Sequence, residues 1–462
     1  MMTKISAPSL HERFTGRVIS PEDTDYDRAR TPFYGGFDHR PAAIIKVADD
    51  TDVARVIELA RETGLELAVR SGGHSLAGHS VSDGGLVLDL SDMRALDIDV
   101  EGRTASAQTG LTAGEYTTAA AAHGLATGFG DTGSVGIGGI TLGGGVGLLL
   151  RKHGLTIDSL LAADVVTADG RLLHVDAENH PDLFWAIRGG GGNFGVATGF
   201  RYRLHEVDRI VGGMLFLPAT ADTVAGFIAA AEAAPDELST IANVMPAPPM
   251  PFIPEEHHGR MLIWALMACT GPIEEAERIV APFRALATPI ADLIRPMTYP
   301  ETFPPEGEEE YHPTAVGRTM FMNTIDRPVA ETIVDTLTAS DASMRVAQLR
   351  VLGGAMARIP ADATAFAHRQ SRIMVNVGAF YEGPEDRKVR EAWVEDFART
   401  LHQGDDGAYV GFLADEGKER VKAAYPGSTW DRLAEIKARY DPDNLFRLNQ
   451  NILPEAQTED GT

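Results

Sequence analysis

The 462-residue sequence contains a single cysteine, few lysines and no long apolar run. A helix that crosses a membrane needs about 20 consecutive apolar residues, so we expect no membrane span. Cys269 can form neither an intrachain disulfide nor a cysteine-based metal site, and its apolar neighbours indicate a buried thiol. The first residues show neither the apolar core nor the cleavage site of an export signal. These absences predict a cytoplasmic protein.

Acidic residues outnumber basic ones, so the formal net charge is −25 at pH 7. Such a charge disfavours binding to nucleic acid or to an anionic membrane. It is compatible with a soluble protein that acts on a small molecule. The length favours more than one domain.

Two regions of different composition are visible along the chain. Strand and helix signals alternate over the first 200 residues: a helix is expected after the strand "PAAIIKV", and a hairpin turns at 168–170. After about residue 207 glycine becomes rarer, and long helices alternate with strands such as "MRVAQLRVL" and "SRIMVNVGAFY". This pattern indicates a second α+β domain with an antiparallel sheet. We place domains at 1–206 and 207–439, with segment 440–462 returning to the first domain.

Three glycine-rich loops, at 70–80, 128–147 and 188–200, are the most informative feature. Glycine lets the backbone approach a ligand closely, and runs of unhindered N–H groups suit a pyrophosphate. One such loop could be no more than a tight turn, but three within 130 residues favour a binding site. None has the strand–GxGxxG–helix context of a Rossmann fold, and no Gly-Lys-Ser/Thr of a P-loop follows.

The motifs "VRSGGHS", "GGITLGGGVG", "HPDLFWAIRGGGGNFGV" and "YDPDNLFRLNQNI" occur here in the order typical of one family. The chain resembles the berberine bridge enzyme-like FAD-linked oxidases of the vanillyl-alcohol oxidase superfamily, over nearly its whole length. The resemblance implies an α+β protein. Its first domain would be a PCMH-type FAD-binding domain of two α/β subdomains. Its second would be a substrate domain with an antiparallel sheet flanked by helices.

The resemblance also implies a covalent bond between His74 and the flavin 8α-methyl group. Members with a second bond carry a cysteine where this chain has Thr132, so we expect a single link, as in the 6-hydroxynicotine oxidase type. Val135 occupies a position where valine favours O2 as electron acceptor. His79 is interpreted as structural, and no metal site is expected because no ligand spacing accompanies it.

By motif match, a set of loop residues is predicted to contact FAD. They are His74, Arg70, Ser71, Gly72, Gly73, Ser75, Gly78, Gly133, Ser134, Val135, Gly138, Gly139, Thr141, Gly144, Gly192, Val196, Asn449 and Asn451.

The predicted substrate pocket departs from the family pattern. Leu76, Val146, Val375, Val377 and Phe412 replace aromatic or polar residues that members often carry. Because a buried, unpaired hydroxyl is costly, these changes predict an apolar pocket. Candidates for a catalytic base are Tyr409, His368 and Tyr381, and a neutral amine could also lose hydride without a protein base.

Together these patterns favour an FAD-dependent oxidase. It would transfer a hydride from a small, rather apolar amine or alcohol, such as a secondary metabolite, and use O2 to give H2O2. Three alternatives remain open: a flavin dehydrogenase or oxidative cyclase with another acceptor, a carbohydrate oxidase, and a noncatalytic flavin-binding protein. The expected partners are the substrate and O2, and a homodimer is the assembly considered.

Overall fold

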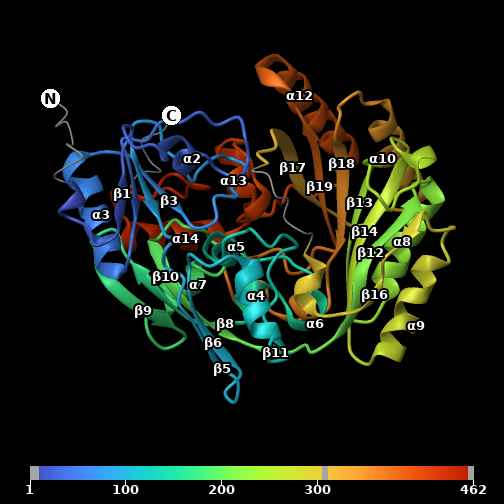
Figure 1. Ribbon diagram of the computed structural model, residues 1–462, viewed down its shortest axis with the longest axis horizontal. Helices are drawn as coiled ribbons and strands as arrows, with labels where there is room; N and C mark the ends of the chain where they lie inside the picture. Colours follow the sequence, from blue (N-terminus) through green and yellow to red (C-terminus); the bar gives the residue numbers. More distant parts are fainter. Residues whose placement is uncertain (1–9, 304–310, 456–462) are drawn as a thin grey trace.

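The computed structural model describes residues 10–303 and 311–455 and contains helices and sheets in two lobes (Figure 1). The ends of the first and third predicted domains, 1–9 and 456–462, lie outside the described residues. The mixed α and β architecture predicted from the sequence is confirmed. The predicted boundary at 206/207 falls between strands β11 (His205–Glu206) and β12 (Ile210–Pro218).

A four-stranded sheet begins the first lobe. Its strand order is β1 (Arg17–Ile19), β2 (Ala43–Lys46), β4 (Leu86–Asp89), β3 (Leu67–Arg70), with β2 and β3 parallel to β4. Helix α3 (Asp50–Thr63) follows β2, as the sequence predicts. The Asp49 side chain caps its first turn, and Gly64 ends it with a φ of 68°. Its apolar face is buried against the sheet.

A five-stranded antiparallel sheet completes this lobe. The strand order is β5 (Leu96–Asp99), β6 (Thr104–Gln108), β10 (Val196–Arg203), β8 (Leu160–Val166), β9 (Leu172–Asp176). The predicted hairpin is the β8–β9 pair. The hydrophobic core of this part draws on helices α4 (Ala113–Ala121), α5 (Ile137–Gly143), α7 (Pro181–Ala186) and α14 (Ser428–Tyr440). Because α14 belongs to this core, the chain returns to the first lobe near its end. Strand β11 pairs separately with β7 (Leu125–Ala126).

The second lobe is built on a large antiparallel sheet, on the right of Figure 1. Its strand order is β15 (Ala291–Asp292), β12, β14 (Met261–Thr270), β13 (Leu238–Pro246), β18 (Arg345–Val351), β19 (Ile373–Phe380), β17 (Ala315–Met322), and β16 (Arg295–Met297) also pairs with β12. One face is covered by helices α8 (Ala221–Ala233), α9 (Ile273–Arg284), α10 (Arg327–Ala339) and α12 (Gly383–Leu401), and their apolar side chains form the main core of the lobe. The other face turns toward the first lobe.

The remaining elements are short. They are α2 (Tyr26–Arg30), α6 (Leu150–His153), α11 (Ala355–Arg358), α13 (Lys418–Ala423) and the 3-10 helices η1 (Thr156–Asp158), η2 (Glu255–His257), η3 (Tyr299–Thr302) and η4 (Val410–Phe412).

Within the described ranges, no helix combines the length and the apolar character that a membrane crossing requires. The same residues contain no cluster of three or more histidine, cysteine or acidic side chains placed to hold a metal ion. Cys269 is buried in β14, and burial raises the pKa of its thiol to about 12. The thiol is therefore protonated at neutral pH and packs as a small apolar side chain.

Candidate functional site

The first two glycine loops touch each other at the start of helix α5. A Cβ atom on Gly72 would lie 2.2 Å from the backbone nitrogen of Gly136, and a Cβ on Gly136 would lie 2.2 Å from the nitrogen of Gly72. The Ser71 hydroxyl donates to the Thr109 carbonyl at 2.6 Å and accepts the N–H of Gly138 at 3.3 Å. Only glycine allows this backbone-to-backbone approach.

The third glycine loop is attached to the other end of α5. The backbone N–H groups of Gly189 and Gly191 both donate to the carbonyl of Leu142, each at 3.0 Å. Helix α5 therefore joins all three loops, which are far apart in the sequence. The chain forms a helix here although the segment is rich in glycine, because its ends are held by the neighbouring loops.

His74 lies half-buried in the first loop. Its ring stacks on the ring of Phe33, with 4.0 Å between centroids and 17° between planes. Burial lowers the pKa of His74 from 6.5 to about 4, and a hydrogen bond to the Ser134 backbone partly opposes this shift. The imidazole is therefore neutral at pH 7 and lies beside the Ser134 backbone.

Arg70 and Ser75, on either side of His74 in the first loop, form hydrogen bonds with nearby backbone. The Arg70 guanidinium is buried and donates to the backbone carbonyls of Ala29, Arg30 and Ser80. The Ser75 hydroxyl accepts the backbone N–H of His79 at 3.4 Å. Arg70 and Ser75 thus stabilise the loop through local hydrogen bonds.

Burial also lowers the pKa of His79 to about 4, while Asp415 opposes the shift. His79 is therefore a neutral side chain at pH 7. Gly78 has a φ of 71°, and a Cβ there would lie 2.5 Å from the ring of Phe37. The turn that closes this loop requires glycine at that position.

The other predicted cofactor residues differ in what they face. The carbonyls of Gly133 and Val135 accept N–H groups from the start of α4. Thr141 is fully buried, and its hydroxyl bonds to that of Tyr202 at 2.8 Å. The Val196 side chain packs in the core of the first sheet.

Two glycines, by contrast, border free space. Gly139 is exposed on α5, and a Cβ built on it meets no atom within 4 Å. Gly192 in the third loop is half-buried, and a Cβ built on it also meets no atom within 4 Å. The second and third loops therefore leave room for a ligand at these two positions.

A buried lysine holds the third glycine loop against the C-terminal segment. The Lys437 ammonium, with 0% of its side chain exposed, donates to the carboxylate of Asp441 at 2.6 Å and to the carbonyls of Asn193 at 2.7 Å and Phe446 at 3.0 Å. The Asn193 amide in turn bonds to the backbone of Gln450 and Ile452. One cation thus fixes two backbone segments at once.

Lys437 was not predicted from the sequence, although a signal existed. It is one of the few lysines, and it lies on the apolar face of α14, four residues after Leu433 and three before Tyr440.

The C-terminal segment brings Asn449 and Asn451 to the third loop. The Asn449 amide nitrogen donates to the carbonyls of Gly192 at 3.2 Å and Phe446 at 2.8 Å, which fixes the orientation of the amide. The side-chain oxygens of Asn449 and Asn451 are buried and accept no hydrogen bond within the described part of the chain. Buried acceptors without a donor indicate a missing ligand that donates hydrogen bonds.

Tyr409 lies against the end of α5. Its hydroxyl oxygen accepts the backbone N–H of Gly145 at 3.1 Å, and its ring packs in an apolar cluster with Val146, Phe366 and Met374, with Phe412 at the edge. Burial raises the pKa of Tyr409. The phenol is therefore protonated at neutral pH and is suited to donate a hydrogen bond.

The other two candidates for a base, His368 and Tyr381, have different surroundings. His368 is buried, its Nε2 is 3.0 Å from the Ala424 carbonyl, and burial lowers its pKa. Tyr381 lies just after β19, where its hydroxyl would be 2.1 Å from a Cβ on Gly36. Of the predicted catalytic and pocket residues, Tyr409, Val146 and Phe412 share one apolar cluster. The His368 ring borders this cluster, because it packs on Phe321 and Phe366.

The structure corrects the placement of two predicted pocket residues. Val375 and Val377 are fully buried in the core under helices α8, α10 and α12, on the face of β19 that turns away from the first lobe. Met374 and Asn376 occupy the opposite face. Side chains alternate along a strand, so an alignment displaced by one residue exchanges the two faces. Leu76 is half-buried in the first loop.

The sheet face toward the first lobe carries a chain of polar side chains. Arg350 is 3% exposed and pairs with Asp131 of the second glycine loop at 2.8 Å. Gln348 accepts from Arg350 Nε at 3.0 Å and donates to Asn243 at 2.9 Å, and Asn243 donates to the Trp264 carbonyl at 3.1 Å. Arg350 also donates to the Val146 carbonyl at 3.2 Å.

Arg350, Gln348 and Asn243 form a polar ladder that the sequence analysis, which predicted an apolar pocket, did not anticipate. Sequence reasoning missed it because Asn243 on β13 and Asp131 in the second glycine loop are far in the chain from Gln348 and Arg350 on β18. The visible signals were a lone carboxylate, Asp131, inside a glycine loop, and Gln348 and Arg350 at the two-residue spacing of a single strand face.

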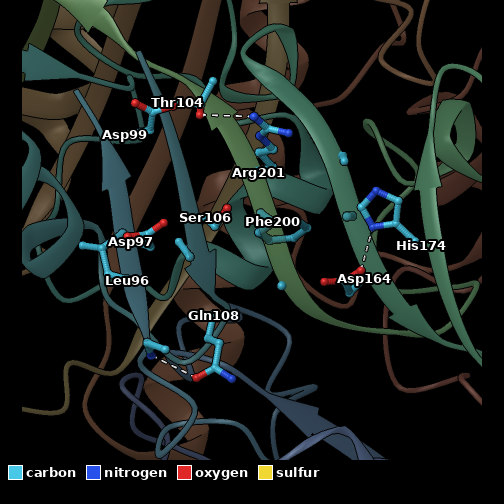
Figure 2. A pocket seen from close by; sticks show the side chains of 15 residues that line it. Leu96, Asp97, Asp99, Thr104, Ser106, Gln108, Asp164, His174, Phe200 and Arg201 are labelled. Carbon is cyan, nitrogen blue, oxygen red and sulfur yellow. Dashed lines mark hydrogen bonds and ion pairs between the residues drawn. The ribbon is translucent and has the colours of Figure 1, made fainter. Parts of the chain in front are cut away.

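A hollow of about 580 Å³ lies elsewhere, on the outward face of the five-stranded sheet (Figure 2). Ser106, Asp164, His174 and Arg201 are among its lining residues. None of the described residues that line this hollow is a predicted site residue. It lies apart from the glycine loops, so we assign it no role in their chemistry.

Comparisons with known proteins agree with this geometry. A family described as FAD binding domain matches residues 41–176, and one described as berberine and berberine like matches residues 408–453. The FAD-linked oxidoreductase YvdP of Bacillus subtilis is 32% identical over 96% of this chain and 99% of its own. The (R)-6-hydroxynicotine oxidase of Paenarthrobacter nicotinovorans is 31% identical over 98% of this chain and 100% of its own.

Among solved structures, 6-hydroxy-D-nicotine oxidase from Arthrobacter nicotinovorans superimposes with a TM-score of 0.85 at 28% identity, covering 96% of this chain and 98% of that one. The first matched region includes the first two glycine loops, and the second includes the C-terminal segment that meets the third loop. The chain therefore belongs to the berberine bridge enzyme-like family of FAD-linked oxidoreductases.

Proposed function

We propose that this oxidoreductase is an oxidase that removes a hydride and a proton from a small amine or alcohol and passes the electrons to O2, giving H2O2. The observation that carries the proposal is the meeting of three glycine loops, His74 and the C-terminal segment around α5, beside the inner face of the large sheet. The similarity to 6-hydroxynicotine oxidase supports an amine as one substrate class.

The residues present fit FAD. Gly139 and Gly192 border open space, and such unhindered backbone suits a pyrophosphate. The unpartnered oxygens of Asn449 and Asn451 need hydrogen-bond donors, which a flavin ring N–H and ribityl hydroxyls supply. These residues would hold the cofactor between the second loop, the third loop and the tail.

We assign His74 as the single covalent attachment point. It is neutral at pH 7, and Ser134 holds one ring nitrogen, so the other presents its lone pair. Attachment at His74 would replace its imidazole N–H bond and one C–H bond of the 8α-methyl group with an N–C bond. O2 would accept the two hydrogens and two electrons that are released, giving H2O2. Thr132 offers no thiol for a second bond.

FAD, when bound, supplies the acceptor for the substrate hydride. Tyr409 contributes a protonated phenol whose oxygen is fixed by the Gly145 N–H, so it orients a ligand by donating a hydrogen bond. His368 is enclosed and bonded to a backbone carbonyl, which leaves it a structural role. The substrate amine would therefore react in its neutral form without a protein base, as the sequence allowed.

The surroundings of Tyr409 suggest a substrate with two different ends. The apolar cluster with Phe366 and Met374 suits a hydrocarbon or aromatic part. The nearby Arg350–Asp131 pair and Gln348 suit a polar group, because Asp131 and Gln348 hold the guanidinium in place before a ligand arrives. Asn243 in turn fixes the Gln348 amide. We therefore propose a small amine or alcohol that carries a hydrogen-bonding group on its far side.

A carbohydrate oxidase is the second candidate, and one observation favours it. Three buried polar atoms near the polar ladder have no hydrogen-bond partner among the described residues: Trp264 Nε1, Thr319 Oγ1 and Asn376 Oδ1. Trp264 lies opposite Asn243 on the neighbouring strand, and Asn376 lies opposite both Gln348 and Thr319. A sugar would supply several hydroxyl partners. A dehydrogenase or oxidative cyclase would share this site and differ in its electron acceptor.

Acid denaturation of the purified, yellow protein tests the cofactor assignment. We expect flavin fluorescence to remain with the denatured chain, and His74→Ala to release it. Anaerobic bleaching of the flavin with amines, alcohols and sugars would then identify the substrate class. Readmission of air with H2O2 formation within seconds supports an oxidase, whereas slow reoxidation would identify a dehydrogenase.

A further inference from the structure

The ring of Phe33 covers one face of the His74 imidazole. The two rings are close to parallel, with 17° between their planes and 4.0 Å between their centroids. Phe33 precedes the first glycine loop by about forty residues and belongs to the segment after α2. No motif of the FAD-binding loops includes it, so the sequence did not indicate the contact.

The segment that carries Phe33 is itself fixed at several points. The Phe33 N–H donates to the Gly73 carbonyl at 3.1 Å, directly before His74. On the other side, the Phe33 carbonyl lies 3.2 Å from Nδ1 of His312, and the Gly35 N–H donates to Pro313 at 3.0 Å. Because 312 and 313 belong to the chain leading into β17, the second lobe holds this ring in place.

Two constraints therefore act on the imidazole. The hydrogen bond to the Ser134 backbone fixes one nitrogen, but alone it leaves the ring free to rotate about that bond. The stacked Phe33 ring fixes the plane in which the second nitrogen's lone pair lies. Stacked aromatic rings attract one another beyond their buried area, so the contact selects one ring orientation.

We propose that Phe33 is a positioning residue for covalent flavin attachment: it holds the His74 ring plane so that the free nitrogen keeps one direction. This inference rests on the proposed attachment through His74. Orientation of a nucleophile strongly affects the rate of bond formation. Loss of the ring is therefore expected to slow attachment roughly tenfold to a hundredfold.

The experiment uses the full-length chain produced without riboflavin and then mixed with FAD. The attachment rate is followed by in-gel flavin fluorescence after denaturation, and the affinity for FAD is measured separately by titration at short times. We expect Phe33→Ala and Phe33→Leu to slow attachment while affinity changes less than about threefold. Phe33→Tyr keeps the aromatic face and should attach at nearly the original rate.

Phe37→Ala is the matched control, because Phe37 lies in the same segment and packs on Gly78 rather than on His74. Equal slowing by Phe37→Ala and Phe33→Ala would overturn the proposal, since it would indicate general loosening of the segment. Normal attachment in Phe33→Leu would overturn it as well. If Phe33→Ala does not fold, the leucine and tyrosine variants decide.

The result for the unmodified chain separates the two levels of inference. If it binds FAD but forms no covalent bond, the attachment through His74 and the role of Phe33 both fail. If it attaches FAD and the Phe33 variants attach it equally fast, only the positioning role fails.

Discussion

Replacement of Lys437 by methionine should destabilise the first lobe far more than any surface substitution on the same helix. The side chains of Lys437 and Asp441 are both 0% exposed, and the ammonium makes three hydrogen bonds to oxygen acceptors. Methionine has a similar length but leaves the Asp441 carboxylate buried without its cation. Breaking a buried pair on one side costs about 3–5 kcal/mol.

The structure places the expected cost toward the lower end of this range. Asp441 still accepts the backbone N–H groups of Leu445 at 2.8 Å and Phe446 at 2.9 Å, so the carboxylate keeps part of its stabilisation. We therefore expect Lys437→Met to lower the free energy of unfolding by about 3 kcal/mol. Arg439→Met is the control, because Arg439 is 66% exposed and pairs with Asp182 at the surface. Its loss should cost about 1 kcal/mol or less.

The measurement is urea unfolding of the FAD-free protein, followed by tryptophan fluorescence, at several pH values. Protonation relieves a buried carboxylate that has lost its cation, so the penalty of Lys437→Met should be full at neutral pH and shrink on acidification. Lys437→Met combined with Asp441→Asn should recover part of the loss. Equal midpoints for the lysine and arginine variants, or a penalty that grows on acidification, would refute the reasoning.

Gly136→Ala should destabilise the protein by about 1–3 kcal/mol and reduce FAD occupancy, because the added Cβ would lie 2.2 Å from a backbone nitrogen of the first loop. Gly139→Ala places its methyl group in open space, so the melting temperature should not change. A titration with FAD should nevertheless show weaker binding by this variant. Arg350→Met and Asp131→Asn should be coupled by about 0.5–3 kcal/mol in a double-mutant cycle, because each leaves the other's charge unpaired; additive effects would show that the pair contributes nothing. Because burial lowers the pKa of His74 and of three other histidines from 6.5 to about 4, the unfolded chain binds protons that the folded chain does not. The melting temperature of the FAD-free protein should therefore fall between pH 6.5 and pH 4, and a constant value over that range would count against buried neutral histidines.

Local sequence determined much of the framework. The apolar periodicity and the glycine at 64 predicted α3 and its end, and the alternating strands around 168–170 predicted the β8–β9 hairpin. The apolar face of α14 also follows from the spacing of its leucine, isoleucine and tyrosine side chains. Such features depend on contacts between residues near one another in the chain, so they can be recognised from spacing alone. The order of the motifs similarly predicted the family.

Tertiary structure decided the parts that join distant segments. Helix α5 forms in a glycine-rich stretch, where helix propensity is poor, because loops from residues 72 and 189 hold its two ends. A shift of one residue along β19 would exchange the side chains that face the first lobe with those that face the core. The spacing of motifs along the chain does not define the strand to that precision.

The polar ladder and the stacking of Phe33 on His74 both depend on contacts between segments that are distant in the chain. Arg350 meets Asp131 across the two lobes, and Phe33 reaches His74 from a segment that carries no recognised motif. By itself, the sequence predicted the residues to which we assign chemistry: the histidine, the glycine loops and the polar tail. Which side chains hold them in place was decided only by packing between the lobes, because those contacts join residues with no fixed spacing along the chain.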